Sequence, residues 1–170
     1  MKKRNQNKIN SGLIGASGEF LVAHELSKRG VIVTLTIKNT PKIDILATNP
    51  ETGAFANIQV KTRSAENKQG WKLTKKVETK TKIKNHYYVF VNLKGSLELP
   101  DFYIIPYNEF ADVISKNYKK WLKMKGKDGQ PHKDNDIRNF KPEKEHLPLY
   151  KDDVLLGKKY KSKWEVLGIL

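Results

Sequence analysis

Apolar and polar positions near the start of the chain follow a helical pattern over residues 11–29. Gly30 comes directly after Lys28 and Arg29, as is typical of a helix end. The apolar stripe of this helix is expected to hold Leu13, Ala16, Phe20, Ala23 and Ser27, with Leu26 beside it. Over residues 31–38 the two kinds of residue alternate, which predicts a first strand with Val31, Val33, Leu35 and Ile37 facing inward.

Residues 41–62 are expected to form two antiparallel strands joined by a tight turn. The first strand is apolar apart from Asp44, and residues 49–53 contain the Pro and Gly that are typical of a hairpin loop. Because side chains alternate along a strand, Gln59 and Lys61 share one face of the second strand. Pairing of the two strands would bring Asp44 close to both. A carboxylate, an amide and an ammonium are costly to bury unless they pair or bind a ligand, so this hairpin is a candidate site.

The middle of the chain predicts two further strands and a second long helix. Residues 87–93 and 102–105 are apolar strand candidates. Residues 108–122 predict a helix whose inner stripe holds Phe110, Val113, Ile114, Asn117 and Trp121. Residues 71–84 favour a short helix or an irregular segment, although the Thr and Lys repetition also fits an exposed strand.

The end of the chain is expected to return to the core after a long excursion. Residues 124–148 are rich in Lys, Asp, Gly, Asn and Pro and are interpreted as a surface segment, whereas residues 154–156 and 164–170 are apolar enough to pack back. The order of helix, strand, hairpin, strands and helix predicts a mixed α/β fold.

A chain of 170 residues predicts one domain with a sizeable core. Residues 1–10 are polar and basic, and form either a flexible arm that touches a phosphate backbone or a frayed terminus. The domain is expected over residues 11–170, with its core in 11–122 and a C-terminal extension in 123–170.

The charge balance indicates a polyanionic partner. Lys and Arg number 33 against 18 Asp and Glu, for a net charge of +15, which favours nucleic acid over the alternative of a protein that is merely soluble and basic. There is no cysteine, so disulfides and thiolate metal sites are excluded. The four histidines are isolated from one another, which argues against a histidine metal site. With no secretory signal and no long apolar stretch, we expect a soluble cytoplasmic protein without membrane contact.

At the hairpin the chain resembles the PD-(D/E)XK nuclease superfamily, which has the restriction-endonuclease-like fold. Pro41 precedes Asp44 by three residues, and Gln59-Val60-Lys61 stands where most members have Asp or Glu, any residue and Lys. Gln59 is the departure from the common motif. Many members also have a Glu on the preceding helix, and Glu19 is well placed for that role. The resemblance implies a mixed β-sheet flanked by helices and hydrolysis of DNA phosphodiester bonds with Mg²⁺, or Mn²⁺ as a substitute.

The resemblance also implies roles for the site residues. Asp44 would be the main metal ligand, Glu19 a second carboxylate, and Gln59 a neutral oxygen ligand. The backbone carbonyl of Val60 could coordinate as well. Lys61 would orient the attacking water and offset the charge of the phosphate.

Four basic residues and one tryptophan around the motif are the expected nucleic-acid contacts: Lys42, Arg63, Lys68, Trp71 and Lys72. Tryptophan more often belongs to a core, but Trp71 follows a basic loop and is the best candidate for stacking on a base. Three alternatives stay open: a nucleic-acid-binding module that kept the fold and lost catalysis, a plain Asp44–Lys61 ion pair, and a basic protein that binds RNA or an acidic protein. The sequence leaves a homodimer open too.

Overall fold

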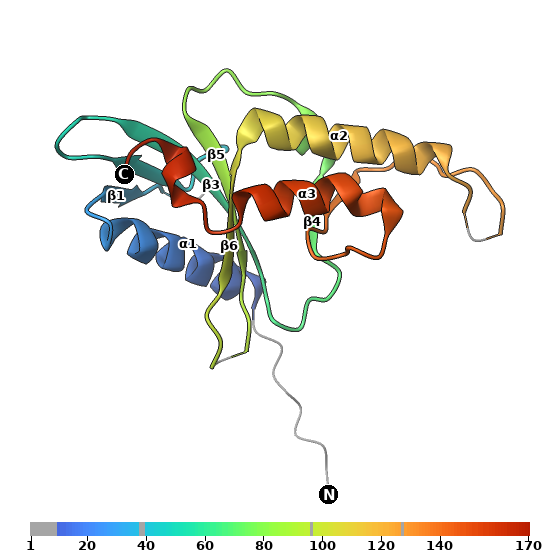
Figure 1. Ribbon diagram of the computed structural model, residues 1–170, viewed down its shortest axis with the longest axis horizontal. Helices are drawn as coiled ribbons and strands as arrows, with labels where there is room; N and C mark the ends of the chain where they lie inside the picture. The colour runs from blue at the N-terminus through green and yellow to red at the C-terminus, as the bar shows by residue number, and fades with distance from the viewer. Residues whose placement is uncertain (1–9, 38–39, 96, 127) are drawn as a thin grey trace, which may run out of the picture.

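A five-stranded mixed sheet forms the centre of the protein (Figure 1). In spatial order its strands are β1 (Ile32–Leu35), β2 (Ile45–Thr48), β3 (Phe55–Arg63), β5 (His86–Asn92) and β6 (Asp101–Pro106). The pairs β1–β2, β2–β3 and β5–β6 are antiparallel, whereas β3 and β5 are parallel. The computed structural model describes residues 10–37, 40–95, 97–126 and 128–170, so the expected N-terminal arm lies almost wholly outside the described residues.

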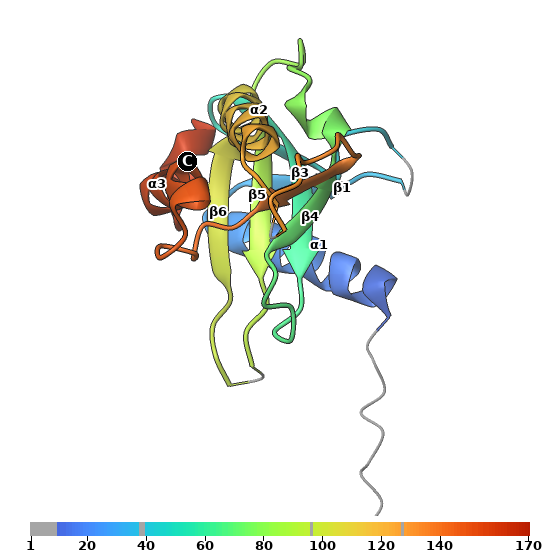
Figure 2. The same ribbon diagram turned by 90° about the vertical axis from the view of Figure 1, so that its right-hand side faces the viewer.

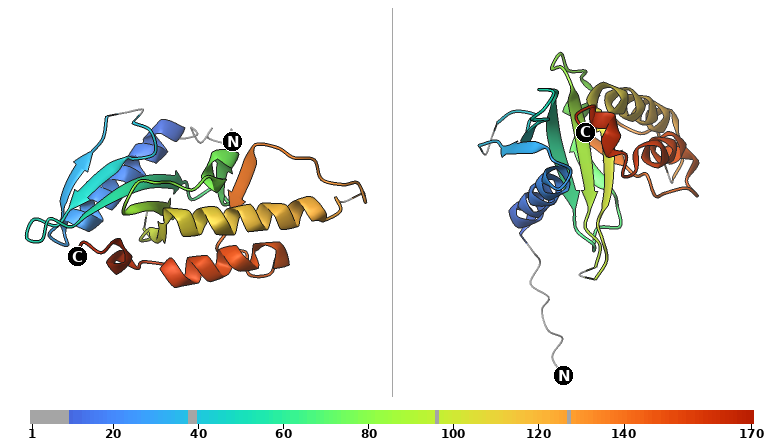
Figure 3. Two further views of the ribbon diagram at one scale, coloured as in Figure 1. Left: turned by 90° about the horizontal axis from the view of Figure 1, so that it is seen from above. Right: turned by 60° about the vertical axis from the view of Figure 1, so that its left-hand side comes forward.

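Helices cover both faces of the sheet (Figure 3). Helix α1 (Ser11–Ser27) packs on one face together with the 3-10 turn η3 (Trp164–Leu167). Helices α2 (Tyr107–Lys123) and α3 (Lys151–Tyr160) lie on the other, with the short turn η2 (Pro148–Tyr150) before α3. The predicted mixed α/β architecture, with a sheet between helices, is confirmed at this level. No helix of the described residues is long and apolar enough to cross a bilayer.

The face of α1 that packs on the sheet is not the predicted stripe. Gly18, Val22 and Leu26 are buried, whereas Leu13 and Phe20 are 65% and 62% exposed. Gly18 has no side chain, so the helix approaches β3 closely at this position, and the face that carries Gly18, Val22 and Leu26 turns toward the sheet. A close approach of this kind outweighs the pattern of larger apolar residues.

Strand β1 is shorter and more exposed than the alternation predicted. Val31 is buried, but Leu35 and Ile37 are exposed, the latter at 86%. The reason is that β1 is the outermost strand of the sheet and ends at Leu35, so the residues that follow have no layer above them.

A second sheet forms from two segments for which no strand was favoured. Strand β4 (Trp71–Thr74) pairs antiparallel with β7 (Ile137–Phe140), and β4 continues into the 3-10 turn η1 (Lys75–Glu78). Figure 2 shows β4 crossing in front of the central strands. The helix favoured for residues 71–84 is therefore reduced to one 3-10 turn, and residues 124–148 contain a strand with buried side chains at Arg138 and Phe140.

The C-terminal segment is an integral part of the core. Trp164, Leu167 and Ile169 are buried in the same cluster as residues of α1 and β3. Val154 of α3 is also buried, and Leu156 packs with the aromatic residues on the opposite face. The prediction that the end of the chain packs back is confirmed.

Candidate functional site

Asp44 lies directly before β2, where β2 and β3 part. Its backbone N–H donates to the Ile58 carbonyl at 2.8 Å, and its carbonyl accepts from the Thr36 N–H at 3.0 Å, so its main chain is held from both sides. Its carboxylate Oδ2 accepts the Val60 N–H at 2.7 Å. Strand β3 continues to Arg63 without β2 beside it, and the Asp44 carboxylate occupies the edge that β2 leaves.

The Val60 carbonyl lies on the same side of β3. In a strand the N–H and C=O of one residue point toward the same neighbour. Since the Val60 N–H is directed to Asp44, the Val60 carbonyl faces that edge too. A carboxylate and a backbone carbonyl thus line the same short stretch of strand edge.

Gln59 and Lys61 share the opposite face of the sheet from Ile58 and Val60. Ile45 is paired with Ile58, and extending this register by one residue sets Asp44 beside Gln59. Both Gln59 and Lys61 are half-buried, and both line the same hollow. The alternation along the return strand that the sequence predicts is therefore the arrangement observed.

Glu19 reaches this region from α1. Its neighbour Gly18 packs against Thr62 of β3, which fixes where the helix crosses the strand. Burial raises the pKa of the Glu19 carboxyl, the negative charge of Asp44 raises it further, and the positive charge of Lys61 offsets part of the rise. The Glu19 carboxyl is therefore close enough to Asp44 and Lys61 for their charges to act on it.

His86, a residue that the sequence did not single out, holds the chain segment that leads into Asp44. Lys42 has a left-handed backbone (φ 65°), and its carbonyl lies 2.8 Å from His86 Nε2. A carbonyl only accepts, so Nε2 carries the hydrogen. His86 is buried and stacks on Tyr107 at 4.3 Å, and burial lowers the pKa of the imidazole below 6.5, so the ring is neutral at about pH 7. Its isolation in the sequence gave no sign of this role, which depends on a partner 44 residues away.

The donor set suits a hard divalent cation. Two half-buried carboxylates, Asp44 and Glu19, repel each other unless a cation lies between them or one is protonated. The Val60 carbonyl and the Gln59 amide oxygen are neutral oxygens of the kind that Mg²⁺ accepts beside its waters. Over the part of the chain that the structure describes, no group of three or more His, Cys, Asp or Glu side chains could hold a metal. Any cation here would therefore depend on the two carboxylates and on neutral oxygens.

Two of the expected nucleic-acid contacts are corrected. Trp71 is 3% exposed, and its Nε1 donates to the Lys61 carbonyl at 2.9 Å, so its ring is not available to a base. Arg63 is also buried, stacks on Trp71, and is paired with Glu143. The side chains of Arg63 and Trp71 both point into the interior from their strands. The neighbouring residues in the sequence do not indicate that orientation.

The other expected contacts are exposed. Lys42, Lys68 and Lys72 lie on the surface, and all three line hollows next to Lys61 or to the loop after β3. Compared with protein-family models, with curated proteins and with solved structures, the chain matches none of them. Its function has to be inferred from the site residues and their surroundings.

Proposed function

We propose that the protein is a metal-dependent nuclease with the restriction-endonuclease-like fold, which hydrolyses phosphodiester bonds in DNA. The observation that carries this proposal is the Asp44 carboxylate held at the edge of β3, with the Glu19 carboxyl of α1 within electrostatic range of it. Glu19 has a raised pKa because of burial and because of Asp44, and Lys61 is near enough to offset the effect. Two carboxylates within electrostatic range of each other and of an ammonium group match the needs of metal-assisted phosphate chemistry.

Each residue has a role in this proposal. Asp44 and Glu19 would hold Mg²⁺ or Mn²⁺, with Gln59 and the Val60 carbonyl as neutral ligands. When bound, such a cation neutralises phosphate charge and lowers the pKa of a coordinated water. Lys61 supplies a positive charge next to the phosphate and orients the attacking water through its ammonium hydrogens.

The raised pKa of Glu19 gives the site a pH dependence. A carboxyl has to lose its proton before it can bind a cation, so metal affinity is expected to fall on acidification. The partner class is supported by the net charge of +15, because an anionic polymer gains from releasing counterions when lysines neutralise its phosphates.

The test combines metal binding with cleavage. We expect Mn²⁺ binding by calorimetry and cleavage of a mixed panel of DNA substrates in the natural protein, and loss of both in Asp44→Asn. Gln59→Glu adds a negative charge and should tighten the metal. Asp112 lies on α2 in an exposed pair with Lys80, so Asp112→Asn is the matched control and should change neither metal binding nor cleavage.

Two results would count against the proposal. Unchanged Mn²⁺ affinity in Asp44→Asn would show that the assigned residues do not form the metal site. Metal binding without cleavage of any substrate, in the natural protein and in Gln59→Glu alike, would identify a binding module that lacks catalysis.

A further inference from the structure

A continuous groove passes the candidate site and runs between β3 and β4. A hollow of about 300 Å³ contains Gln59 and Lys61 on one side and residues of β4 and η1 on the other. A second hollow of about 620 Å³ follows the end of β3 and the loop after it. The two hollows share Lys61, Lys72 and Leu73, so they are parts of one groove.

The groove is lined by lysines without an acidic partner. Among the described residues, no ion pair involves the lysines that line it, namely Lys42, Lys61, Lys68, Lys72 and Lys76. Within the described ranges of the chain, Glu66 is the one acidic residue that lines either hollow. On α2, by contrast, Lys116 and Lys120 both pair with Asp152. Ammonium groups that are not held in ion pairs along a groove attract a polyanion.

The wall of the groove opposite β3 is fixed at its base and from behind. At the base, the Trp71 indole donates to the Lys61 carbonyl at 2.9 Å, which ties β4 to β3. Behind, β4 is paired with β7 along its whole length, from Trp71 with Phe140 to Thr74 with Ile137. The wall is therefore part of a second sheet and not a loose loop.

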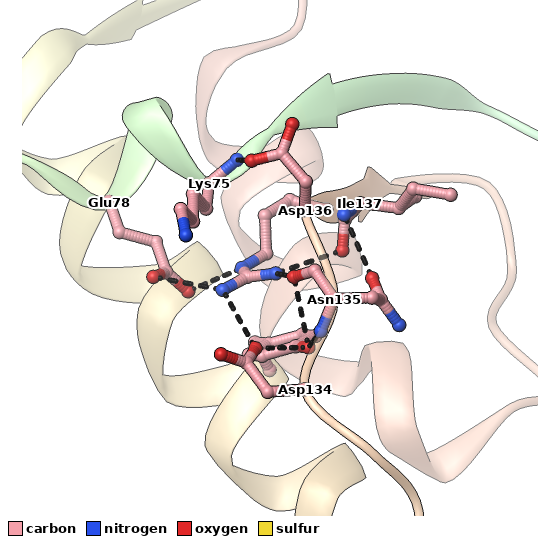
Figure 4. Close-up of polar contacts among 8 residues, drawn as sticks. Lys75, Glu78, Asp134, Asn135, Asp136 and Ile137 are labelled. Carbon is pink, nitrogen blue, oxygen red and sulfur yellow. Dashed lines mark hydrogen bonds and ion pairs between the residues drawn. The ribbon is translucent and has the colours of Figure 1, made fainter.

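A buried arginine braces the far end of this wall through hydrogen bonds to Glu78 and Asn135, which are labelled in Figure 4. Arg138 is 4% exposed, and it donates to the two carboxylate oxygens of Glu78 at 2.6 and 3.2 Å and to the Asn135 carbonyl at 2.6 Å. The Lys75 N–H adds a hydrogen bond to the Asp136 carbonyl at 2.9 Å. Moving η1 outward would take the Glu78 carboxylate away from the buried Arg138 charge and leave only the longer pair with Asp134 at 3.8 Å, which is unfavourable. The width of the groove is therefore set by the fold.

We propose that this groove binds one unpaired strand of DNA and that the protein acts on single-stranded segments. Lys42, Lys72 and Lys76 line the same hollow as Lys61, so a phosphate that reaches Lys61 comes near their ammonium groups as well. A flexible single strand enters such a groove, as in other proteins that follow one backbone with a positively charged channel. A duplex carries its second strand directly behind the first and so needs a wider opening, which the bracing of the wall by Arg138 and by β7 opposes. The cleavage of that strand rests on the proposed nuclease function, whereas its binding does not.

The test measures binding without cleavage. Asp44→Asn is titrated with a fluorescent single-stranded oligodeoxynucleotide and with the blunt duplex of the same sequence, over a series of salt concentrations. We expect the single strand to bind about tenfold or more tightly than the duplex. Adding Lys72→Gln and Lys76→Gln should lower the affinity for the single strand and reduce the slope of log K against log salt by roughly 0.7 per lost phosphate contact.

The control variant also removes two positive charges, but from a part of the surface outside the groove. Lys119→Gln with Lys123→Gln changes two lysines of α2 that line a different hollow, and the salt slope should stay nearly unchanged. All four positions are exposed, and thermal unfolding checks that each variant is folded. Equal effects of the two pairs, or a duplex bound as tightly as the single strand, would overturn the inference.

The two proposals fail in different ways. DNA cleavage by the natural protein, combined with equal binding of duplex and single strand, would support the nuclease function and contradict single-strand binding by the groove. Selective binding of the single strand without any cleavage would support single-strand binding by the groove and contradict the nuclease function.

Discussion

At the scale of single residues, Glu19 and Glu25 on the same helix show how surroundings decide what a carboxylate does. Burial and Asp44 raise the pKa of Glu19. For Glu25, burial acts in the same upward direction, but hydrogen bonds from Lys28 and Arg29 outweigh it and lower the pKa. The first carboxylate is held where its charge is unfavourable, which is typical of functional sites, and the second belongs to a surface ion pair.

Glu19→Gln is expected to make the protein more stable near neutral pH while abolishing metal binding. The folded-state pKa of Glu19 lies above its ordinary value, so folding favours the protonated form, and stability is lost as pH rises through the raised pKa. The gain from Glu19→Gln should therefore be present at about pH 7 and vanish below about pH 4. Thermal unfolding over this pH range measures it.

Glu25→Gln is the matched control and should have the opposite sign. The folded-state pKa of Glu25 is lowered, so its contribution to stability is present above its ordinary pKa and is lost on acidification. A loss of stability at neutral pH from both substitutions would mean that Glu19 is an ordinary surface carboxylate.

At the scale of elements, the contact between α1 and β3 sets the distance between the Glu19 carboxylate and the strand. A side chain at Gly18 would overlap the hydroxyl and methyl groups of Thr62, whereas a side chain at Gly15 would meet nothing within 4 Å. Because the two glycines lie on one helix, comparing their substitution by alanine separates the effect of helix propensity from the effect of packing.

Gly18→Ala is expected to cost about 1–3 kcal/mol of unfolding free energy, because the helix has to shift away from β3. The same shift should weaken Mn²⁺ binding by moving Glu19. Gly15→Ala should instead stabilise the protein by about 0.5–1 kcal/mol, since alanine favours the helix and nothing obstructs it. Urea denaturation of the two variants measures both effects, and stabilisation by Gly18→Ala would show that the helix does not approach β3 as closely as described.

At the scale of the whole molecule, the chain ends by completing the core that it begins with. Trp164 is 4% exposed and packs against Phe102 at 5.2 Å, and the Arg29 guanidinium lies over its ring at 5.1 Å. The C-terminal turn thus contacts both β6 and the end of α1. Residues 123–170 are needed for the fold on both faces of the sheet, because Phe140 and Leu156 fill the other side.

Trp164→Ala is expected to destabilise the protein by about 3–5 kcal/mol, as is usual for removing a buried large aromatic side chain. Leu155→Ala, at a position 56% exposed on α3, should change stability by no more than about 0.5 kcal/mol. Chemical denaturation compares the two. Equal and small effects would mean that the C-terminal segment is an appendage and that residues 11–122 fold without it.

The sequence by itself determined the local arrangement of the site. Alternation along a strand has a period of two residues, so it places Gln59 and Lys61 on one face whatever surrounds them. The turn residues between two apolar runs likewise predicted the hairpin that brings Asp44 beside β3. The strands β5 and β6, the helix α2 and the excess of lysine were also readable, because each is a property of a short segment or of composition.

Only the tertiary structure decided what depends on contacts between distant segments. The pairing of β4 with β7 joins residues more than 60 positions apart, so neither short strand could be recognised from its own pattern. The burial of Arg63 and Trp71, the face of α1 that packs on the sheet, and the hold of His86 on the Lys42 carbonyl have the same origin. Each of these follows from which surface another part of the chain covers, and periodicity carries no information about that partner.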